Sequence, residues 1–145
     1  MTTLQEAAAL GRSDHGLAVV STLRADGTIQ SSLVNAGILA HPSTGEPVLA
    51  LVTYGPVKLA NLRARPQVTA TLRAGWRWAA IEGRAELAGP DDPRPWADAE
   101  RLRLLLRAIF VAAGGSHDDW DEYDRVMAEQ RRVAVLIAPD RIYGN

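Results

Sequence analysis

The sequence of 145 residues contains no cysteine, which excludes disulfide bonds, a thiolate nucleophile and any metal site with thiolate ligands. It also lacks an excess of basic residues, because 16 lysines and arginines stand against 17 acidic residues. A surface that neutralises nucleic-acid phosphates is therefore not expected. No apolar run is long enough to cross a membrane, and residues 1–16 resemble neither a signal peptide nor a membrane span. We expect a cytoplasmic protein with no nucleic-acid or membrane partner.

Patterns of classical catalytic groups are also missing. The three histidines, at positions 15, 41 and 117, are far apart in turn-like contexts, so no metal site is expected. The acidic stretch 117–121 is explained by the start of a helix, where carboxylates cap the chain and face the positive end of the helix dipole. Neither a Ser-His-Asp pattern nor a pair of glutamates is present, so no catalytic residue is assigned.

Six segments have the composition of strands, with β-branched and apolar residues between turn signals. Asp26-Gly27 is the strongest hairpin signal in the chain. A small antiparallel sheet with long apolar strands favours closure into a barrel, because closure removes exposed edges. The predicted strands are 16–23, 29–40, 48–53, 67–74, 76–89 and 132–144.

Four helices are expected, one before the first strand and three between strands, at 2–11, 57–65, 97–113 and 116–130. The first has Thr3 as its cap and Gly11 as its stop. The second begins after Pro56, which suits a first helical turn, and ends before Pro66. The length fits one domain, spanning 1–145, of the α+β class with mainly β structure.

Lys58 is the only lysine in the chain, and it follows a Gly-Pro turn at the start of a helix. Hydroxyl groups are expected nearby at Thr53, which ends a strand, and at Ser31 or Ser32. Adjacent serines on a strand face opposite ways, so only one of these two can point into a cleft. Lysine, hydroxyls and free amides at a helix N-terminus would bind an anion such as phosphate. A solvated lysine beside surface serines is equally compatible with the residues alone.

Several motifs occur in a specific order: "TLRADG…SS", "K-x-x-N-L-R-x-R-P-x-V", "GW…A-x-E-G-x-A-E-L" and "SHDDWDEY…RRV…IYG". With this order and spacing, the chain resembles the pyridoxamine-phosphate-oxidase-like split β-barrels from about Gly16 to Gly144. Within them it is most similar to the actinobacterial branch that uses the deazaflavin coenzyme F420.

The resemblance implies a six-stranded antiparallel split β-barrel with peripheral helices, which forms a homodimer with two cofactor sites at the subunit interface. Lys58, Thr53 and the serine pair would hold the cofactor phosphate, and the backbone of residues 30–34 would run beside the ring. The implied cofactor-binding residues are Gln30, Ser31, Ser32, Leu33, Val34, Thr53, Tyr54, Lys58, Trp78 and Arg132.

Some roles stay open at this point. Trp76 and Trp78 share a strand face and serve either as core or dimer contacts or as walls of the ring pocket. Arg131 and Arg132 are either surface charge or include one residue that meets the partner's cofactor, such as its polyglutamate tail.

The site also departs from the family in its charge. Many relatives carry a basic residue close before this lysine, whereas this chain has "YGPVK". The phosphate site therefore loses a charge, or borrows one from Arg63 or from an arginine of the partner. A proton could come from Tyr54, Tyr143 or solvent.

The activity implied is hydride transfer between F420 and an unidentified small-molecule substrate. An enzyme that uses flavin mononucleotide (FMN), or a cofactor-binding protein without turnover, is the alternative. Hydride transfer is the cofactor's own chemistry, so the lack of a catalytic dyad does not argue against an enzyme.

Overall fold

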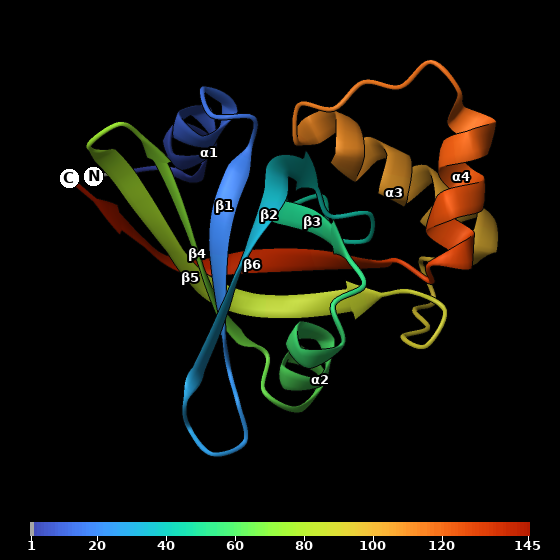
Figure 1. The fold of residues 1–145 in the computed structure, drawn as a ribbon, viewed down its shortest axis with the longest axis horizontal. Helices are drawn as coiled ribbons and strands as arrows, with labels where there is room; N and C mark the ends of the chain where they lie inside the picture. Colours follow the sequence, from blue (N-terminus) through green and yellow to red (C-terminus); the bar gives the residue numbers. More distant parts are fainter. Residues whose placement is uncertain (1) are drawn as a thin grey trace.

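A computed structural model describes residues 2–145 and contains a closed barrel of six strands in the order β1-β2-β3-β6-β5-β4 (Figure 1). Every neighbouring pair is antiparallel. The predicted six-stranded antiparallel barrel with peripheral helices is thus confirmed. The strands are β1 Leu17–Leu23, β2 Ile29–Ala40, β3 Pro47–Thr53, β4 Gln67–Ala74, β5 Arg77–Ala88 and β6 Val133–Gly144.

Two apolar clusters stabilise the barrel. The first fills its interior with alternate residues of the strands, because side chains along a strand point to opposite faces. The second lies outside, where β3 and β6 meet the helices. β3 contributes to both clusters, so its residues from Val48 to Leu51 are all buried. Its unbroken apolar sequence reflects burial on two faces.

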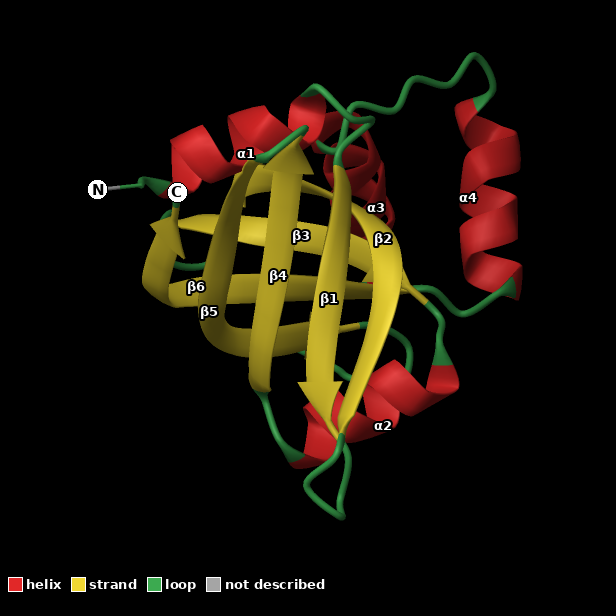
Figure 2. Ribbon diagram, turned by 60° about the vertical axis from the view of Figure 1, so that its left-hand side comes forward, coloured by secondary structure: helices red, strands yellow, loops and turns green. Residues whose placement is uncertain are grey.

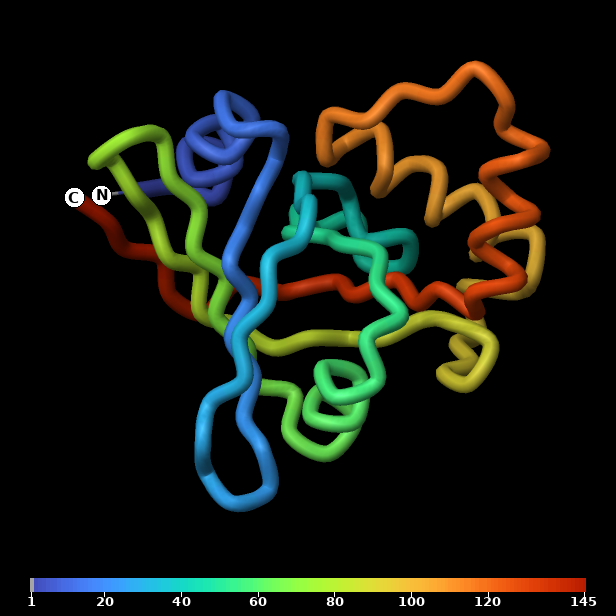
Figure 3. The backbone as a smooth tube through the Cα atoms, viewed as in Figure 1, coloured from blue at the N-terminus to red at the C-terminus, as the bar shows by residue number. Residues whose placement is uncertain are grey.

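Four helices surround the barrel: α1 Leu4–Arg12, α2 Pro56–Ala64, α3 Ala99–Ala112 and α4 Trp120–Glu129. In Figure 2, α1 crosses one end of the barrel and α2 packs at the other end. α3 contacts β2, β3 and β6 from outside, and α4 packs on α3. The tube in Figure 3 shows the long connection between α3 and α4, after which the chain returns to the barrel as β6. No helix within residues 2–145 is long and apolar enough to cross a membrane.

The structure corrects three local predictions. Gly11 lies inside α1 and does not stop it: a Cβ at this position would be 2.3 Å from Cδ2 of Leu72, so a larger residue would force the Leu72 side chain to shift. α4 begins at Trp120 rather than at 116, since its N-cap is Asp119, whose side chain accepts a hydrogen bond from the Glu122 amide. Trp76, which was predicted to begin a strand and to share a strand face with Trp78, lies instead in the turn before β5 and is 94% exposed. Thr3 is the N-cap of α1, as predicted.

Candidate functional site

Lys58 is a buried cation in the first turn of α2. Its side chain is only 5% exposed, and Nζ donates a hydrogen bond to Oγ1 of Thr53 at 3.3 Å. Within residues 2–145 no carboxylate lies within ion-pair distance of this ammonium group. Burial lowers the pKa of Lys58 below that of an ordinary lysine. The interpretation of Lys58 as a solvated helix residue is therefore wrong.

The side chain of Lys58 lines a cavity of about 480 Å³ between the end of β3, the start of α2 and the helices α3 and α4. The volume is in the range typical of small-molecule sites. Most of the lining is apolar or aromatic, with a few polar groups near the end of β3. The lining residues are Leu33, Val34, Asn35, Val52, Thr53, Tyr54, Gly55, Pro56, Lys58, Ile109, Phe110, Ala113, Tyr123, Met127 and Arg132.

A second cation reaches this cavity from the residue before β6. The guanidinium carbon of Arg132 lies 3.8 Å from the centre of the Tyr54 ring, which is cation–π geometry. Burial lowers the pKa of Arg132, although a guanidinium remains charged in a protein. Arg63, in contrast, is held by two hydrogen bonds to Asp92, at 3.0 and 2.7 Å. Arg63 is therefore already paired and does not supply the charge missing before Lys58.

The serine pair divides between the two faces of β2. Ser31 Oγ is 2.9 Å from Ser21 Oγ on the exposed face. Ser32 lies on the inner face, and its buried Oγ has no hydrogen-bond partner among the described residues. Gln30 also faces inward and accepts a hydrogen bond from Thr22 Oγ1 at 2.8 Å. Ser32 is thus the serine with an unused buried hydroxyl, a feature that normally requires an explanation.

The structure brings six of the ten predicted residues together around the Lys58 cavity: Leu33, Val34, Thr53, Tyr54, Lys58 and Arg132. Gln30, Ser31 and Ser32 lie further along β2, toward the β1–β2 turn, and do not line it. Trp78 does not line it either. Tyr143 is outside as well, since its hydroxyl donates to Glu82 at 2.5 Å on the β5–β6 ladder.

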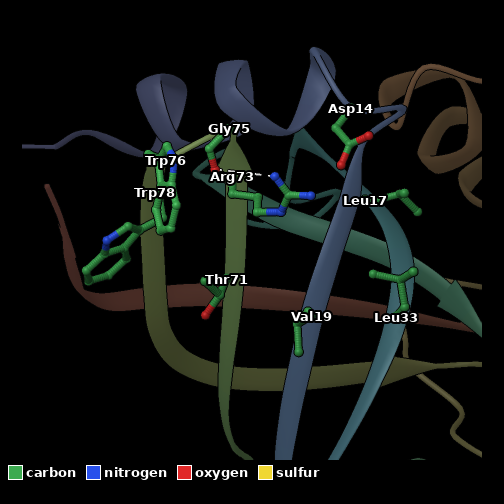
Figure 4. A pocket seen from close by; sticks show the side chains of 9 residues that line it. All are labelled: Asp14, Leu17, Val19, Leu33, Thr71, Arg73, Gly75, Trp76 and Trp78. Carbon is green, nitrogen blue, oxygen red and sulfur yellow. Dashed lines mark hydrogen bonds between the residues drawn. The ribbon is translucent and has the colours of Figure 1, made fainter.

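Trp78 lines a different cavity, of about 760 Å³, on the outer face of β1, β2, β4 and β5 (Figure 4). Val19 and Leu33 project to this face from neighbouring strands, and their exposed fractions are 44% and 62%. Leu33 lines both cavities. The lining residues are Asp14, Leu17, Val19, Leu33, Thr71, Arg73, Gly75, Trp76 and Trp78.

Sequence reasoning missed the far wall of the Lys58 cavity. Phe110, Tyr123 and Met127 come from α3 and α4, where helical spacing predicts only core positions. The Tyr123 hydroxyl donates to the Leu106 carbonyl at 2.9 Å, and burial raises its pKa to about 12. No sequence signal separates such a wall from ordinary core, because both need apolar and aromatic side chains.

The residues fit an anionic group with an apolar body. Lys58 has no acidic partner within residues 2–145, and the N-cap of α2, Gly55, provides no side-chain cap. The amides of Val57 and Lys58, which follow Pro56 in the first turn, can therefore bind an anion. The apolar wall of α3 and α4 fits a flat ring. Residues 2–145 contain no cluster of three or more histidine, aspartate or glutamate side chains that could hold a metal ion.

No protein-family model matches the chain. Solved structures match it in fold. A conserved hypothetical protein from Mycobacterium tuberculosis is 21% identical with a TM-score of 0.70, over 99% of this chain and 84% of that chain. An F420 reductase is 19% identical with a TM-score of 0.58, over 88% of both chains. A FAD-binding protein from Mesorhizobium loti is 13% identical with a TM-score of 0.61, over 99% and 94%.

These similarities show the fold: the chain has the same six-stranded split β-barrel as these structures. Heme-binding proteins share this fold with F420 reductases and flavin-binding proteins. The fold therefore hosts several cofactors, and the function has to be argued from the site.

Proposed function

We propose that this chain binds coenzyme F420 in the Lys58 cavity and is an oxidoreductase that transfers a hydride between this cofactor and a small reducible molecule. The observation that carries the proposal is the buried Lys58 ammonium, which among residues 2–145 has one hydroxyl partner and no carboxylate at ion-pair distance. FMN, which also has a phosphate and a flat ring system, is the alternative cofactor.

The cost of burying Lys58 supports an anion at this place. Moving an ammonium group out of water costs several kcal/mol unless a partner compensates for the lost hydration. The Thr53 hydroxyl supplies one hydrogen bond, whereas an ammonium has three donors. A phosphate at the start of α2 would accept from Lys58 and from free backbone amides together.

The apolar part of the cavity would hold the ring. Phe110 and Met127 would contact it and exclude water, and Val34 would pack beside it from β2. The bound deazaflavin would supply the hydride chemistry, while the chain supplies binding and orientation. Tyr54 lines the cavity, whereas Tyr143 does not. Tyr54 is therefore the better of the two candidates for a proton donor.

We also propose a homodimer, with a second copy covering the outer sheet face shown in Figure 4. Val19, Leu33, Trp76 and Trp78 expose apolar surface there, which is typical of an interaction site. Leu33 belongs to this face and to the Lys58 cavity. A second copy on this face would therefore lie beside the cofactor site and could help to close it.

A binding titration tests the proposed cofactor. Purified protein is titrated with F420 and, separately, with FMN, and tryptophan fluorescence is recorded. Trp120 is a suitable reporter, since its ring is 5.3 Å from that of Tyr123 in the cavity wall. Tight F420 binding with weak FMN binding is expected. Tight FMN binding with weak F420 binding would indicate that FMN is the cofactor. If the protein binds neither, the cofactor proposal is contradicted. Binding without reduction of any screened substrate would favour a protein without turnover.

A further inference from the structure

A further cavity, the α3–α4 groove, has a volume of about 450 Å³ and lies between α3, α4 and the connection of residues 89–98 that leads from β5 to α3 (Figure 1). Met127 and Arg132 line both this groove and the Lys58 cavity, so they form the partition between the two. The other residues that line the groove do not line the Lys58 cavity. The groove is therefore a separate site from the one that we assign to the cofactor.

Short side chains leave the α3–α4 groove open. Pro90 and Pro93 line it from the connection, and Ala128 lines it from α4. Leu102 and Leu106 of α3 give it an apolar base, and Leu106 is only 5% exposed. Proline and alanine side chains are too short to fill the space between the helices and the connection. The result is an apolar hollow with a volume in the range typical of small-molecule sites.

The connection is a wall with a fixed shape. Gly89 and Asp92 exchange two backbone hydrogen bonds, each of 3.1 Å. Further along, Arg94 Nε donates to the Leu87 carbonyl at 2.7 Å and ties the connection back to β5. A wall that is already ordered has little conformational freedom to lose when a ligand binds, which favours binding.

The charged groups between α3 and α4 are paired with one another. Asp124 of α4 accepts hydrogen bonds from Arg103 Nη1 and from Arg107 Nε, both at 2.9 Å. Arg103 also donates from Nε to Glu100 at 2.9 Å. Two arginines and two carboxylates thus balance, and of these Arg103 and Asp124 line the groove. An ionic ligand would find its counter-charge already engaged.

We propose that the α3–α4 groove is a second ligand site, which binds a small, uncharged and mainly apolar molecule distinct from the cofactor. Apolar walls bind such a molecule by removing apolar surface from water, whereas an ion buried there without a partner would lose its hydration. Arg132, at the partition, stacks on Tyr54, which lines the Lys58 cavity and not the groove. The inference does not depend on which cofactor the Lys58 cavity binds.

An uncharged fluorescent probe tests the site without any cofactor. N-phenyl-1-naphthylamine is apolar and fluoresces strongly in apolar surroundings. Wild-type protein is expected to bind it saturably and to unfold at a higher temperature in its presence. Ala128→Phe and Ala99→Phe place a ring in the groove from α4 and from α3, and each is expected to abolish saturable binding. Two blocking variants from different helices keep the test independent of the folding of either one.

Controls show where the probe binds. Ala60→Phe is the matched control, because Ala60 is also an exposed alanine within a helix but does not line the groove. Leu33→Glu changes a residue that lines the Lys58 cavity and the outer sheet cavity but not the groove. Both control variants are expected to bind the probe as wild-type protein does. The proposal is overturned if wild-type protein shows no saturable binding, if the blocking variants keep it, or if Leu33→Glu loses it.

A charged analogue tests the ligand class. 8-Anilinonaphthalene-1-sulfonate has the same aromatic skeleton as the probe and adds a sulfonate. It is expected to bind the groove more weakly, because Glu100 and Asp124 already occupy the nearby arginines. If the sulfonate binds more tightly than the uncharged probe, and Ala128→Phe removes that binding, the assignment of the groove to an uncharged ligand is wrong.

Discussion

The Nζ atom of Lys58 donates its hydrogen bond to Oγ1 of Thr53 across the turn between β3 and α2, and both side chains are buried. This hydrogen bond joins the last residue of β3 to the first turn of α2. Pro56 is the first residue of α2, and its fixed φ suits that position. The buried ammonium group lines the cavity and has little contact with water.

Lys58→Met should weaken binding of F420 at least tenfold and leave the fold intact. Methionine has a similar length and carries no charge, so the desolvation penalty disappears while the packing is largely kept. The free energy of unfolding, from urea denaturation, should stay the same or increase. Dissociation constants come from the fluorescence titration, with Arg131→Gln as the matched control on an exposed cation. Unchanged F420 affinity in Lys58→Met would show that Lys58 does not bind the cofactor.

The pH dependence of stability should show two opposed contributions at alkaline pH. The pKa of Lys58 is lowered in the folded state, so between that pKa and about 10.5 the unfolded chain binds more protons and stability rises with pH. The pKa of Tyr123 is raised to about 12, so its contribution is full below about pH 10 and is lost as pH rises toward 12.

Urea denaturation from pH 7 to 11 separates the two groups. Lys58→Met should remove the rise, and Tyr123→Phe should reduce the later fall. Part of the fall should remain, because the hydrogen bond to Glu82 also raises the pKa of Tyr143. Tyr123→Phe should also cost about 1 kcal/mol at neutral pH, because its hydrogen bond to Leu106 is lost. Parallel profiles for wild-type protein and Lys58→Met would contradict the lowered pKa of Lys58.

Much of the barrel could be predicted, because local signals set its elements. The bounds of β2 and β4 agree with the predicted 29–40 and 67–74. The hairpin at Asp26-Gly27 carries its own turn chemistry, since the Asp26 carboxylate accepts from the Thr28 amide and Gly27 has a φ of 85°. Strand composition and turn residues are properties of a few neighbouring positions, so they can be recognised in a single sequence.

The site was harder to predict, because it depends on contacts between distant segments. The proximity of Tyr54 and Arg132 follows from the pairing of β3 with β6, which no local pattern encodes. Lysine is almost never fully buried, so the sequence alone left Lys58 equally compatible with a solvated helix. The wall formed by Phe110 requires the position of α3 over the barrel, which is a matter of tertiary packing.

Leu33→Glu should give a monomer if the outer sheet face pairs with a second copy. A charge in the centre of an apolar interface would be desolvated without a partner. Size-exclusion chromatography with light scattering should give a dimer mass for wild-type protein and a monomer mass for this variant. Leu104→Glu is the control, since Leu104 is also exposed but lies on α3. A monomer mass for wild-type protein would rule out the dimer.

Gly37→Ala should destabilise the protein by about 1–3 kcal/mol, the usual cost of forcing an extra methyl group into a close contact. A Cβ at Gly37 would lie 2.2 Å from the backbone oxygen of Ala112, at the end of α3. Backbone cannot rotate away as a side chain can, so α3 would have to move off β2. Urea denaturation measures the loss. Gly55→Ala is the control, because a Cβ there would meet only ordinary contacts, at 3.7 and 4.0 Å. Equal stabilities for the two variants would show that α3 can shift freely on the barrel, and that the wall of the Lys58 cavity is not fixed by Gly37.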